Sequence, residues 1–225
     1  MRLIKPVCIL LFTLSGILFS CTAKVKPESD QNDKMGAQLE NAFTLPKSWW
    51  PAGSHAEETN IGSHSSEYDM GIAKGEGEHG KNAATIKYKE GATGFGTLMQ
   101  SCIPYKYLGK RVRMTGSIKS ENVESFSGMW LRVDQASSLT ALAFDNMQNR
   151  GITGTTGWKK YEIVLDVPTN ATLLSYGVQL RGKGQVWFEN ISFEEVDKSI
   201  PVTGTETIGQ PGFVQPEPSN LNFEE

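Results

Sequence analysis

The chain has 225 residues, of which 38% are hydrophobic, 9% aromatic and 21% charged. These proportions are typical of a globular domain accompanied by some unstructured chain, and they allow one hydrophobic core or at most two. The formal net charge is -3, which excludes the basic surface that nucleic-acid-binding proteins present to phosphates. We therefore expect no nucleic acid partner.

Residues 1–20 have the pattern of an export signal. Arg2 and Lys5 flank the start of the apolar run VCILLFTLSGILF, which matches the basic and hydrophobic regions of a signal peptide. The run is shorter than the ~20 apolar residues of a comfortable membrane span. It ends in LFSC at residues 18–21, which resembles the lipobox of bacterial lipoproteins.

That resemblance implies cleavage before Cys21 and a lipid on its thiol, so that the membrane is a partner through the lipid. The location implied is the bacterial cell envelope: the outer membrane where the organism has one, otherwise the outer face of the cell membrane. The alternative is an uncleaved N-terminal anchor. After export only Cys102 remains besides Cys21, which leaves no intramolecular disulfide. We expect Cys102 to be a buried small residue.

The polar stretch at residues 21–38 has no periodicity and predicts a flexible tether. From residue 39 to about 197 the sequence shows short segments of alternating polarity between Gly, Asn, Ser and Pro, which indicates an all-β sandwich in a single domain. About eight antiparallel strands are expected, the number in a jelly roll. Their ranges are 83–88, 94–103, 110–119, 127–134, 139–147, 158–168, 172–181 and 185–196.

Turn signals fall between these segments. Pro168 ends one strand, GKG at 182–184 predicts a tight turn, and GTTG at 154–157 predicts a loop before Trp158. Residues 198–225 form a tail rich in Pro, Thr and Gly. Its end, PEPSNLNFEE, resembles the start of another domain of this kind; alternatively it returns to the single domain as an edge strand.

These segments carry a family resemblance. The pieces YLGKRVRMTGSIK, MWLRVD, FDNM, GTTGWKKYEIVLDVP and YGVQLRGKGQVWFENISFEEV resemble the galactose-binding-like jelly roll of many carbohydrate-binding modules. The variety is one that also occurs fused to bacterial transcriptional regulators. The resemblance implies the fold for nearly the whole mature domain. It leaves the function open, since members bind glycans, hold a structural calcium ion, or do neither.

One face of the strand SGMWLRVD suggests a ligand site. Met129, Leu131 and Val133 alternate with the polar and aromatic residues and are expected in the core. Sugars stack on aromatic rings and bind planar polar groups. The candidate ligand-binding residues are Trp130, Arg132, Asp134, Gln100, Asp145, Asn146, Gln179 and Arg181.

The alternative for the same residues is a structural network in which Arg132 pairs with Asp134 or Asp145. For Trp158 and Trp187, core packing is the expectation. Trp49 and Trp50 lie in a loop flanked by Pro, where one of the two is available to a ligand.

A structural calcium ion is the one cofactor considered. The resemblance implies carboxylates from early and late strands, and Glu40, Asp69 and Glu189 are the candidates. The histidines lack ligand spacing, so no metal site is expected on them. GEGEHG at 75–80 matches a dinucleotide fingerprint, but it precedes a strand where that motif requires a helix, and we reject it.

Three functions compete. The first is a membrane-anchored, non-catalytic binding module of the envelope that recognises carbohydrate. The second is a structural, protein-interaction or sensory module whose partner is an envelope protein. The third is a glycan hydrolase with two carboxylates in a pocket. No catalytic residues are assigned, because the sequence lacks GxSxG and all three histidines lie in predicted loops.

Overall fold

The computed structural model describes residues 43–54, 68–136, 138, 140–204 and 217–225. The chain divides into two units, Met1–Glu40 and Asn41–Glu225, and every described residue belongs to the second. The export signal, the predicted tether, Cys21 and Glu40 therefore lie outside the described residues. Within those residues no helix is long and apolar enough to cross a membrane.

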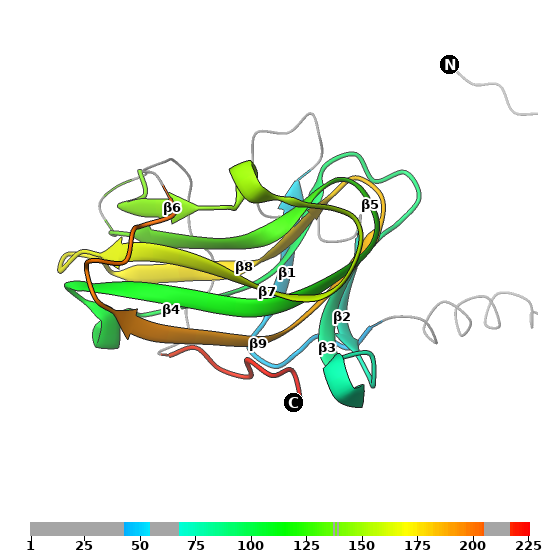
Figure 1. Cartoon of the computed structure of the whole chain (residues 1–225), viewed down its shortest axis with the longest axis horizontal. Helices are drawn as coiled ribbons and strands as arrows, with labels where there is room; N and C mark the ends of the chain where they lie inside the picture. The colour runs from blue at the N-terminus through cyan, green and yellow to red at the C-terminus, as the bar shows by residue number, and fades with distance from the viewer. Residues whose placement is uncertain (1–42, 55–67, 137, 139, 205–216) are drawn as a thin grey trace, which may run out of the picture. The chain divides into compact units, whose positions relative to one another are not determined.

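The described domain consists of antiparallel strands with three short 3-10 turns between them (Figure 1). The strands are β1 (Trp50–Ser54), β2 (Tyr68–Ala73), β3 (Ala83–Tyr88), β4 (Phe95–Cys102), β5 (Lys110–Asp134), β6 (Ala143–Asp145), β7 (Ile152–Val167), β8 (Leu173–Arg181) and β9 (Gln185–Val196). The turns are η2 (Glu78–Gly80), η3 (Tyr105–Tyr107) and η4 (Gln148–Arg150).

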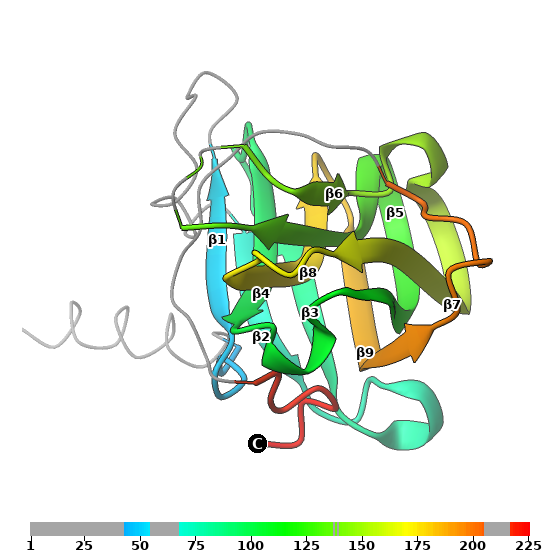
Figure 2. The same cartoon turned by 90° about the vertical axis from the view of Figure 1, so that its left-hand side faces the viewer.

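Strand β5 joins the two layers of the fold. Its first half pairs with β9 up to Glu121 and with β7 as far as Ser127, and its second half, from Phe126, pairs with β8 and β6. One layer, the β9 layer, therefore has the order β7-β5-β9-β3-β2, and the other, the β8 layer, has the order β6-β5-β8-β4-β1. Figure 2 shows the strands curving around a common interior. This arrangement is a jelly-roll β-sandwich, as the sequence predicts.

Three predicted strand ranges are wrong, and within 139–147 the described strand is only β6, Ala143–Asp145. The segments 110–119 and 127–134 belong to one strand, because β-bulges between Ile118 and Ser127 bend β5 while its pairing with β7 continues. Asn122, with φ of 51°, lies in this bend. The GTTG segment lies inside β7 rather than in a loop, since Gly154 pairs with Val123 across the bulge.

The core contains the residues that alternation places there. Met129, Leu131 and Val133 are fully buried, together with Tyr176 from β8 and Phe188 from β9. Cys102 is also fully buried, and burial raises the pKa of its thiol to about 12. The thiol therefore behaves as a small packing group at physiological pH.

The end of the tail returns to the domain. Phe223 is fully buried, with its ring 5.1 Å from that of Trp49 and 5.2 Å from that of Phe188. The tail does not form an edge strand, because Asn220 and Phe223 have φ values of 46° and 61°. These left-handed residues turn the backbone so that Phe223 enters the core.

Candidate functional site

The outer surface of the β8 layer holds most of the predicted ligand-binding residues. Paired residues on neighbouring strands share one side of a sheet, and Trp130 pairs with Gly177, which pairs with Met99, which pairs with Trp50. Alternation along each strand adds the rest of this surface, which we call the Trp130 face. Its members are Trp50, Thr97, Met99, Ser101, Trp130, Arg132, Asp134, Ser175, Gly177, Gln179 and Arg181.

Arg132 and Asp134 form a closed pair. Arg132 Nε lies 2.8 and 2.7 Å from the two carboxylate oxygens of Asp134, and its Nη2 donates to one of them at 2.6 Å. Both residues are buried, with 7% and 2% exposure. A buried charge must be paired and hydrogen-bonded to be tolerated. The pair is thus a structural brace and is not available to a ligand.

Trp130 is held in place from below. Its indole Nε1 donates to the hydroxyl of Thr97 at 2.8 Å, and that hydroxyl donates to the carbonyl oxygen of Val178 at 2.8 Å. Thr97 is buried, whereas Trp130 remains partly exposed. The polar edge of the indole is therefore satisfied by the sheet, and part of its apolar surface reaches solvent.

The other end of the face carries free polar groups. Gln179 is partly exposed and Arg181 is exposed, and neither side chain has a hydrogen bond or ion pair within the described parts of the chain. Between them and the brace the side chains are small. Ser175 and Ser101 share a hydrogen bond of 2.8 Å, and Gly177 has no side chain. The Trp130 face thus combines a fixed aromatic ring, a small-residue strip and unpaired polar groups.

Gln100 does not belong to this face, and its assignment is corrected. It pairs with Tyr176 on the inner side of the layer and is fully buried. Its Oε1 accepts from the Tyr176 hydroxyl and, at 2.8 Å, from the backbone N–H of Ser219. Its Nε2 donates to the carbonyl oxygens of Ser48 and Ser219 at 3.0 and 3.1 Å. Gln100 therefore fastens the tail to the core.

Asp145 also points away from the Trp130 face, because it pairs with the core residue Leu131. Its carboxylate accepts from Arg150 Nη2 at 2.6 Å and from the backbone N–H of Met147 at 2.7 Å. The predicted pairing of Asp145 with Arg132 is thus absent, and Arg150 takes that place. A pocket of about 440 Å³ lies here, lined by Phe144, Asp145, Asn146, Gln148, Asn149, Thr203 and Gly204.

Asn146 lines the same pocket and stabilises its rim. The Oδ1 of Asn146 accepts from the backbone N–H of Gln148 at 3.1 Å, which forms an Asx turn at the start of η4. Phe144 pairs with Arg132, so its ring belongs to the side of the sheet that carries the Trp130 face. The sequence placed Asn146 on the same surface as Trp130, whereas the structure places it in this neighbouring pocket.

The predicted calcium ligands are not brought together among the described residues. Asp69 faces Lys89, with 3.6 Å between the charged atoms. Glu189 is 2% exposed, accepts from the backbone N–H of Glu78 and from Asn190 Nδ2 at 2.9 Å each, and has its pKa raised by burial. No cluster of three metal-binding side chains occurs in the described parts of the chain. With Glu40 outside them, the calcium site stays a prediction.

The other tryptophans have distinct environments. Trp49 is buried and donates to the carbonyl oxygen of Asn220 at 3.2 Å, so it packs in the core. Trp50 is half-buried at the start of β1. Trp187 is 7% exposed and packs in a small cluster with the partly buried Trp158 outside the main core. The ammonium of Lys119 lies 4.4 and 5.5 Å from the centres of these two rings.

Five members of the Trp130 face were not among the predicted ligand-binding residues: Thr97, Met99, Ser101, Ser175 and Gly177. Their alternation with Leu98, Leu174 and Val178 does place them opposite the core side of β4 and β8. The missing information was the register, which alone shows that Gly177 lies beside the ring of Trp130. Small side chains in a strand carry no functional signal without that pairing.

The chain was compared with known proteins. No family model matches it. It is 46% identical over 166 residues to the "Uncharacterized HTH-type transcriptional regulator YbfP" of Bacillus subtilis, a match that covers 73% of this chain and 55% of that protein. The chain thus spans about half the length of the curated relative it matches.

Similar solved structures have low sequence identity. The xylan-binding domain CBM22-1 of Paenibacillus barcinonensis Xyn10C is 12% identical, covering 70% of this chain and 90% of that one, with a TM-score of 0.45. The domain TmCBM61, solved with β-1,4-galactotriose, is 12% identical, covering 68% and 91%, with a TM-score of 0.44. The active domain of bacteriophage CBA120 tailspike protein 4 is 10% identical, covering 67% and 20%, with a TM-score of 0.48. The jelly-roll assignment rests on the strand pairing of this chain.

Proposed function

We propose that this protein is a non-catalytic carbohydrate-binding module that recognises a neutral glycan on the Trp130 face. One observation carries the proposal: the partly exposed ring of Trp130 is fixed by Thr97 beside the unpaired side chains of Gln179 and Arg181. A sugar ring needs both an apolar platform and planar hydrogen-bonding groups. The face provides these together on two adjacent strands.

Gly177 lets β8 and β4 approach each other closely beside Trp130. Gly177 lies directly beside Trp130 across the β5–β8 pair, and a Cβ there would collide with the carbonyl oxygen of Leu98. Glycine is therefore required by the close approach of β4. The indole reaches across β8 to Thr97 on β4, and the CH face of a sugar would stack on the exposed part of the ring while the sugar hydroxyls reach Gln179.

We further propose that the module is lipid-anchored in the bacterial cell envelope. The support is the LFSC sequence at 18–21, preceded by a basic start and an apolar run. A lipid on Cys21 followed by a polar tether would present the jelly roll to glycans outside the membrane. Radiolabelled palmitate incorporated by the wild-type chain and lost in Cys21→Ala is the expected result.

A glycan-binding measurement tests the main proposal. The full chain is titrated with neutral β-1,4-linked xylo-, galacto- and gluco-oligosaccharides in a calorimeter. Trp130→Ala should weaken the binding of the recognised sugar by about tenfold or more, and Gln179→Ala by less, since tenfold corresponds to about 1.4 kcal/mol. Trp158→Ala, which removes a tryptophan from the β9 layer, is the matched control and should bind normally.

Two outcomes would overturn the proposal: wild-type chain that binds none of these sugars at millimolar concentration, or Trp130→Ala that binds as tightly as wild type. The thermal unfolding midpoint of each variant shows whether a loss of binding comes from unfolding. A hydrolase is disfavoured because Asp134 and Asp145 are each held by an arginine.

The second candidate is a sensory or protein-interaction module. It is favoured by the Arg132–Asp134 brace, in which the two charged groups at one end of the face bind each other and not a ligand. It is also favoured by the similarity to a protein named as a transcriptional regulator. Such a module would bind no sugar, so the same titration separates the two candidates.

A further inference from the structure

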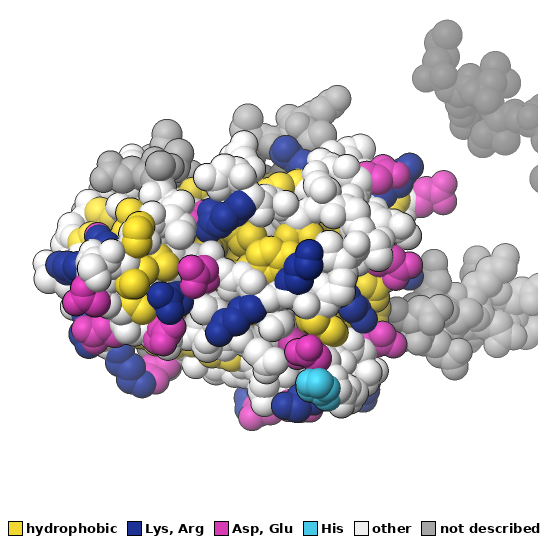
Figure 3. All heavy atoms as spheres, in the orientation of Figure 1, with side chains coloured by type: hydrophobic (Ala, Val, Ile, Leu, Met, Phe, Trp, Pro, Cys, Tyr) yellow, Lys and Arg dark blue, Asp and Glu magenta, His cyan; other side chains and the backbone are white. Residues whose placement is uncertain are grey.

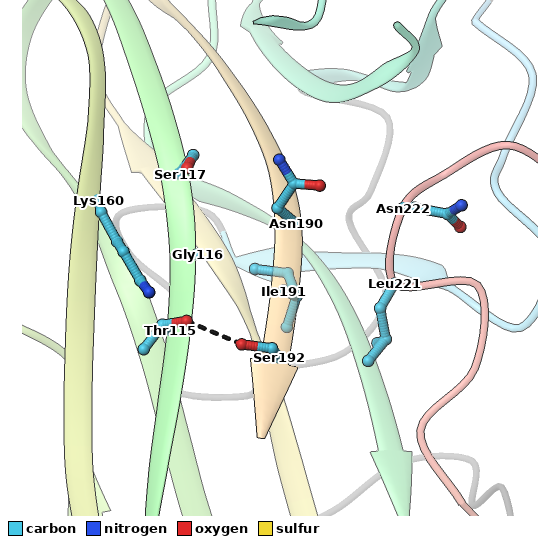
Figure 4. A pocket seen from close by; sticks show the side chains of 9 residues that line it. All are labelled: Thr115, Gly116, Ser117, Lys160, Asn190, Ile191, Ser192, Leu221 and Asn222. Atoms are coloured by element: carbon cyan, nitrogen blue, oxygen red, sulfur yellow. Dashed lines mark hydrogen bonds between the residues drawn. The ribbon is translucent and has the colours of Figure 1, made fainter. Parts of the chain in front are cut away.

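A second pocket lies on the outer surface of the β9 layer, away from the Trp130 face. Its volume is about 470 Å³. Strands β5, β7 and β9 and the returning tail each contribute to its wall (Figure 4). We call it the Lys160 pocket, and its lining residues are Thr115, Gly116, Ser117, Lys160, Asn190, Ile191, Ser192, Leu221 and Asn222.

A β-bulge and the tail create this pocket. Between the pairs Thr115–Ser192 and Ser117–Glu189, β9 has one residue more than β5. Asn190 adopts a left-handed φ of 55° there and is exposed, while Ile191 turns into the core. Strand β3 does not pair with β9 beyond Phe188, and the tail fills the open edge.

The tail is fixed firmly enough to serve as a wall. The backbone N–H of Ile191 donates to the carbonyl oxygen of Leu221 at 3.2 Å, and the neighbouring Phe223 is anchored in the core. Figure 4 shows Asn222 on the tail across β9 from Lys160 on β7. With strands ~4.8 Å apart, three such intervals span ~14 Å, the length of a short oligosaccharide.

The lining side chains are neutral hydrogen-bonding groups with one cation. Thr115 and Ser192 hydroxyls lie 2.8 Å apart. Asn190 donates its Nδ2 to Glu189 at 2.9 Å, which leaves its Oδ1 to accept from a ligand. No carboxylate is among the residues that line the pocket. Lys160 Nζ is thus the only charged group among the described residues that line the pocket.

Lys160 differs from the other cations on this surface. Arg111 pairs with Asp166 at 2.8 Å, Arg113 lies 3.3 and 3.1 Å from Glu162 and Glu194, and Lys119 contacts the two tryptophan rings. Lys160 is exposed and has no ion pair or hydrogen bond with any described residue. In the middle of the face shown in Figure 3, Lys and Arg side chains surround hydrophobic ones, with the acidic side chains mostly toward the edges.

We propose that the Lys160 pocket is a second saccharide site, specific for a sugar that carries a carboxylate. The ammonium of Lys160 would pair with the carboxylate, while the sugar hydroxyls would bind Ser117, Asn190 and Asn222. A carboxylate is the complement of an unpaired ammonium, and the hydroxyl and carboxamide groups around it match a polyhydroxylated ring. This site lies on the opposite layer from the Trp130 face and does not depend on the proposed function.

Trigalacturonate, with galactotriose as its neutral counterpart, is the probe for this site. We expect the full chain to bind trigalacturonate in a calorimetric titration, and we expect added salt to weaken that binding. Lys160→Gln should weaken it about tenfold or more, and Lys160→Arg should largely restore it. Lys159→Gln is the matched control, since Lys159 is also exposed, is adjacent in β7 and does not line the pocket.

Several results would overturn the inference. Wild-type chain that fails to bind trigalacturonate contradicts it, as does an equal loss in Lys160→Gln and Lys159→Gln, which would indicate unspecific charge attraction. Trp130→Ala distinguishes this site from the proposed neutral-glycan site. Acidic-sugar binding should survive that substitution, and its loss would show that trigalacturonate occupies the Trp130 face instead.

Discussion

The Trp130 face and the Lys160 pocket each contain a cation among polar side chains, but the two cations are in opposite states. Arg132 is buried and bound through both carboxylate oxygens of Asp134, whereas Lys160 is exposed and unpaired in the described chain. Burial forces the pairing in the first case, because an unpaired charge in the interior costs several kcal/mol. Residue type alone therefore does not identify a binding group; its pairing does.

The same contrast holds for the neutral groups. On the Trp130 face the indole N–H and the hydroxyls of Thr97, Ser101 and Ser175 are all satisfied within the sheet. Among the described polar side chains of that face, Gln179 and Arg181 are left for a ligand. In the Lys160 pocket, Ser117 and Asn222 have no side-chain partner among the described residues. The first surface offers an aromatic platform with few polar contacts, and the second offers polar contacts with little aromatic area.

Removing the anchor of the tail should have the largest effect and should act on the Lys160 pocket alone. Phe223→Ala deletes a fully buried ring that packs on Trp49 and Phe188. Such a change costs about 3 to 5 kcal/mol of unfolding free energy, which urea denaturation measures. The pocket should lose its Leu221 and Asn222 wall, whereas the Trp130 face should keep its affinity. Unchanged stability would contradict the packing of the tail.

Breaking the brace tests whether Arg132 is structural. Arg132→Ala leaves Asp134 buried without a partner, so we expect a loss of about 3 to 5 kcal/mol in urea denaturation. The double variant Arg132→Met with Asp134→Leu should recover most of that loss, because neither charge remains. If the single variant is as stable as wild type but loses sugar affinity, Arg132 is a ligand contact and the brace interpretation is wrong.

Removing the hydroxyl of Thr97 that holds the indole of Trp130 should have an intermediate effect on stability. Thr97→Val keeps the shape of the side chain but leaves the indole N–H and the Val178 carbonyl without the bridging hydroxyl. An unsatisfied buried group costs about 1 to 3 kcal/mol, and neutral-glycan affinity should fall because the ring is less well oriented. Ser117→Ala in the other layer serves as the control, and it should leave neutral-glycan binding unchanged.

Breaking the ion pair between Arg111 and Asp166 should have the smallest effect on stability. The hydrogen bonds from Arg111 lower the pKa of the Asp166 carboxyl. A carboxyl whose pKa is depressed in the folded state stabilises above its unfolded pKa of about 4, and that contribution disappears as pH falls through the folded pKa. Asp166→Asn should therefore be slightly less stable than wild type at pH 7, and the difference should shrink as the pH falls through the folded pKa of Asp166. A difference that persists at low pH would exclude this ion pair as its source.

Alternating polarity predicted the strands well where each strand stays within one layer. The segments 83–88 and 185–196 coincide with β3 and β9, and the core positions Met129, Leu131 and Val133 were assigned correctly. It failed at β5, because the bulges that bend this strand between the two layers interrupt the alternation while the pairing with β7 continues. A period of two also gives no information about which side of one strand faces its neighbour.

The lack of register information explains why two of the predicted ligand-binding residues, Gln100 and Asp145, do not lie on the Trp130 face. Gln100 and Asp145 have the composition of ligand-binding residues, but their registers with Tyr176 and Leu131 turn them inward. Trp130, Arg132, Asp134, Gln179 and Arg181 do share a face, as alternation within β5 and β8 predicts. The Lys160 pocket was not foreseen, because a bulge and a tail from residues 217–225 create it, and neither has a sequence signature of its own.

Sugar binding on the Trp130 face is tested most directly by a nuclear magnetic resonance titration of the nitrogen-15-labelled full chain. The recognised neutral oligosaccharide is added stepwise while the indole N–H of Trp130, the side-chain amide of Gln179 and the guanidinium of Arg181 are followed. We predict saturable shifts that are largest at these groups, with Lys160 and Asn222 unaffected. Shifts confined to another surface, or none at saturating sugar, would contradict the claim.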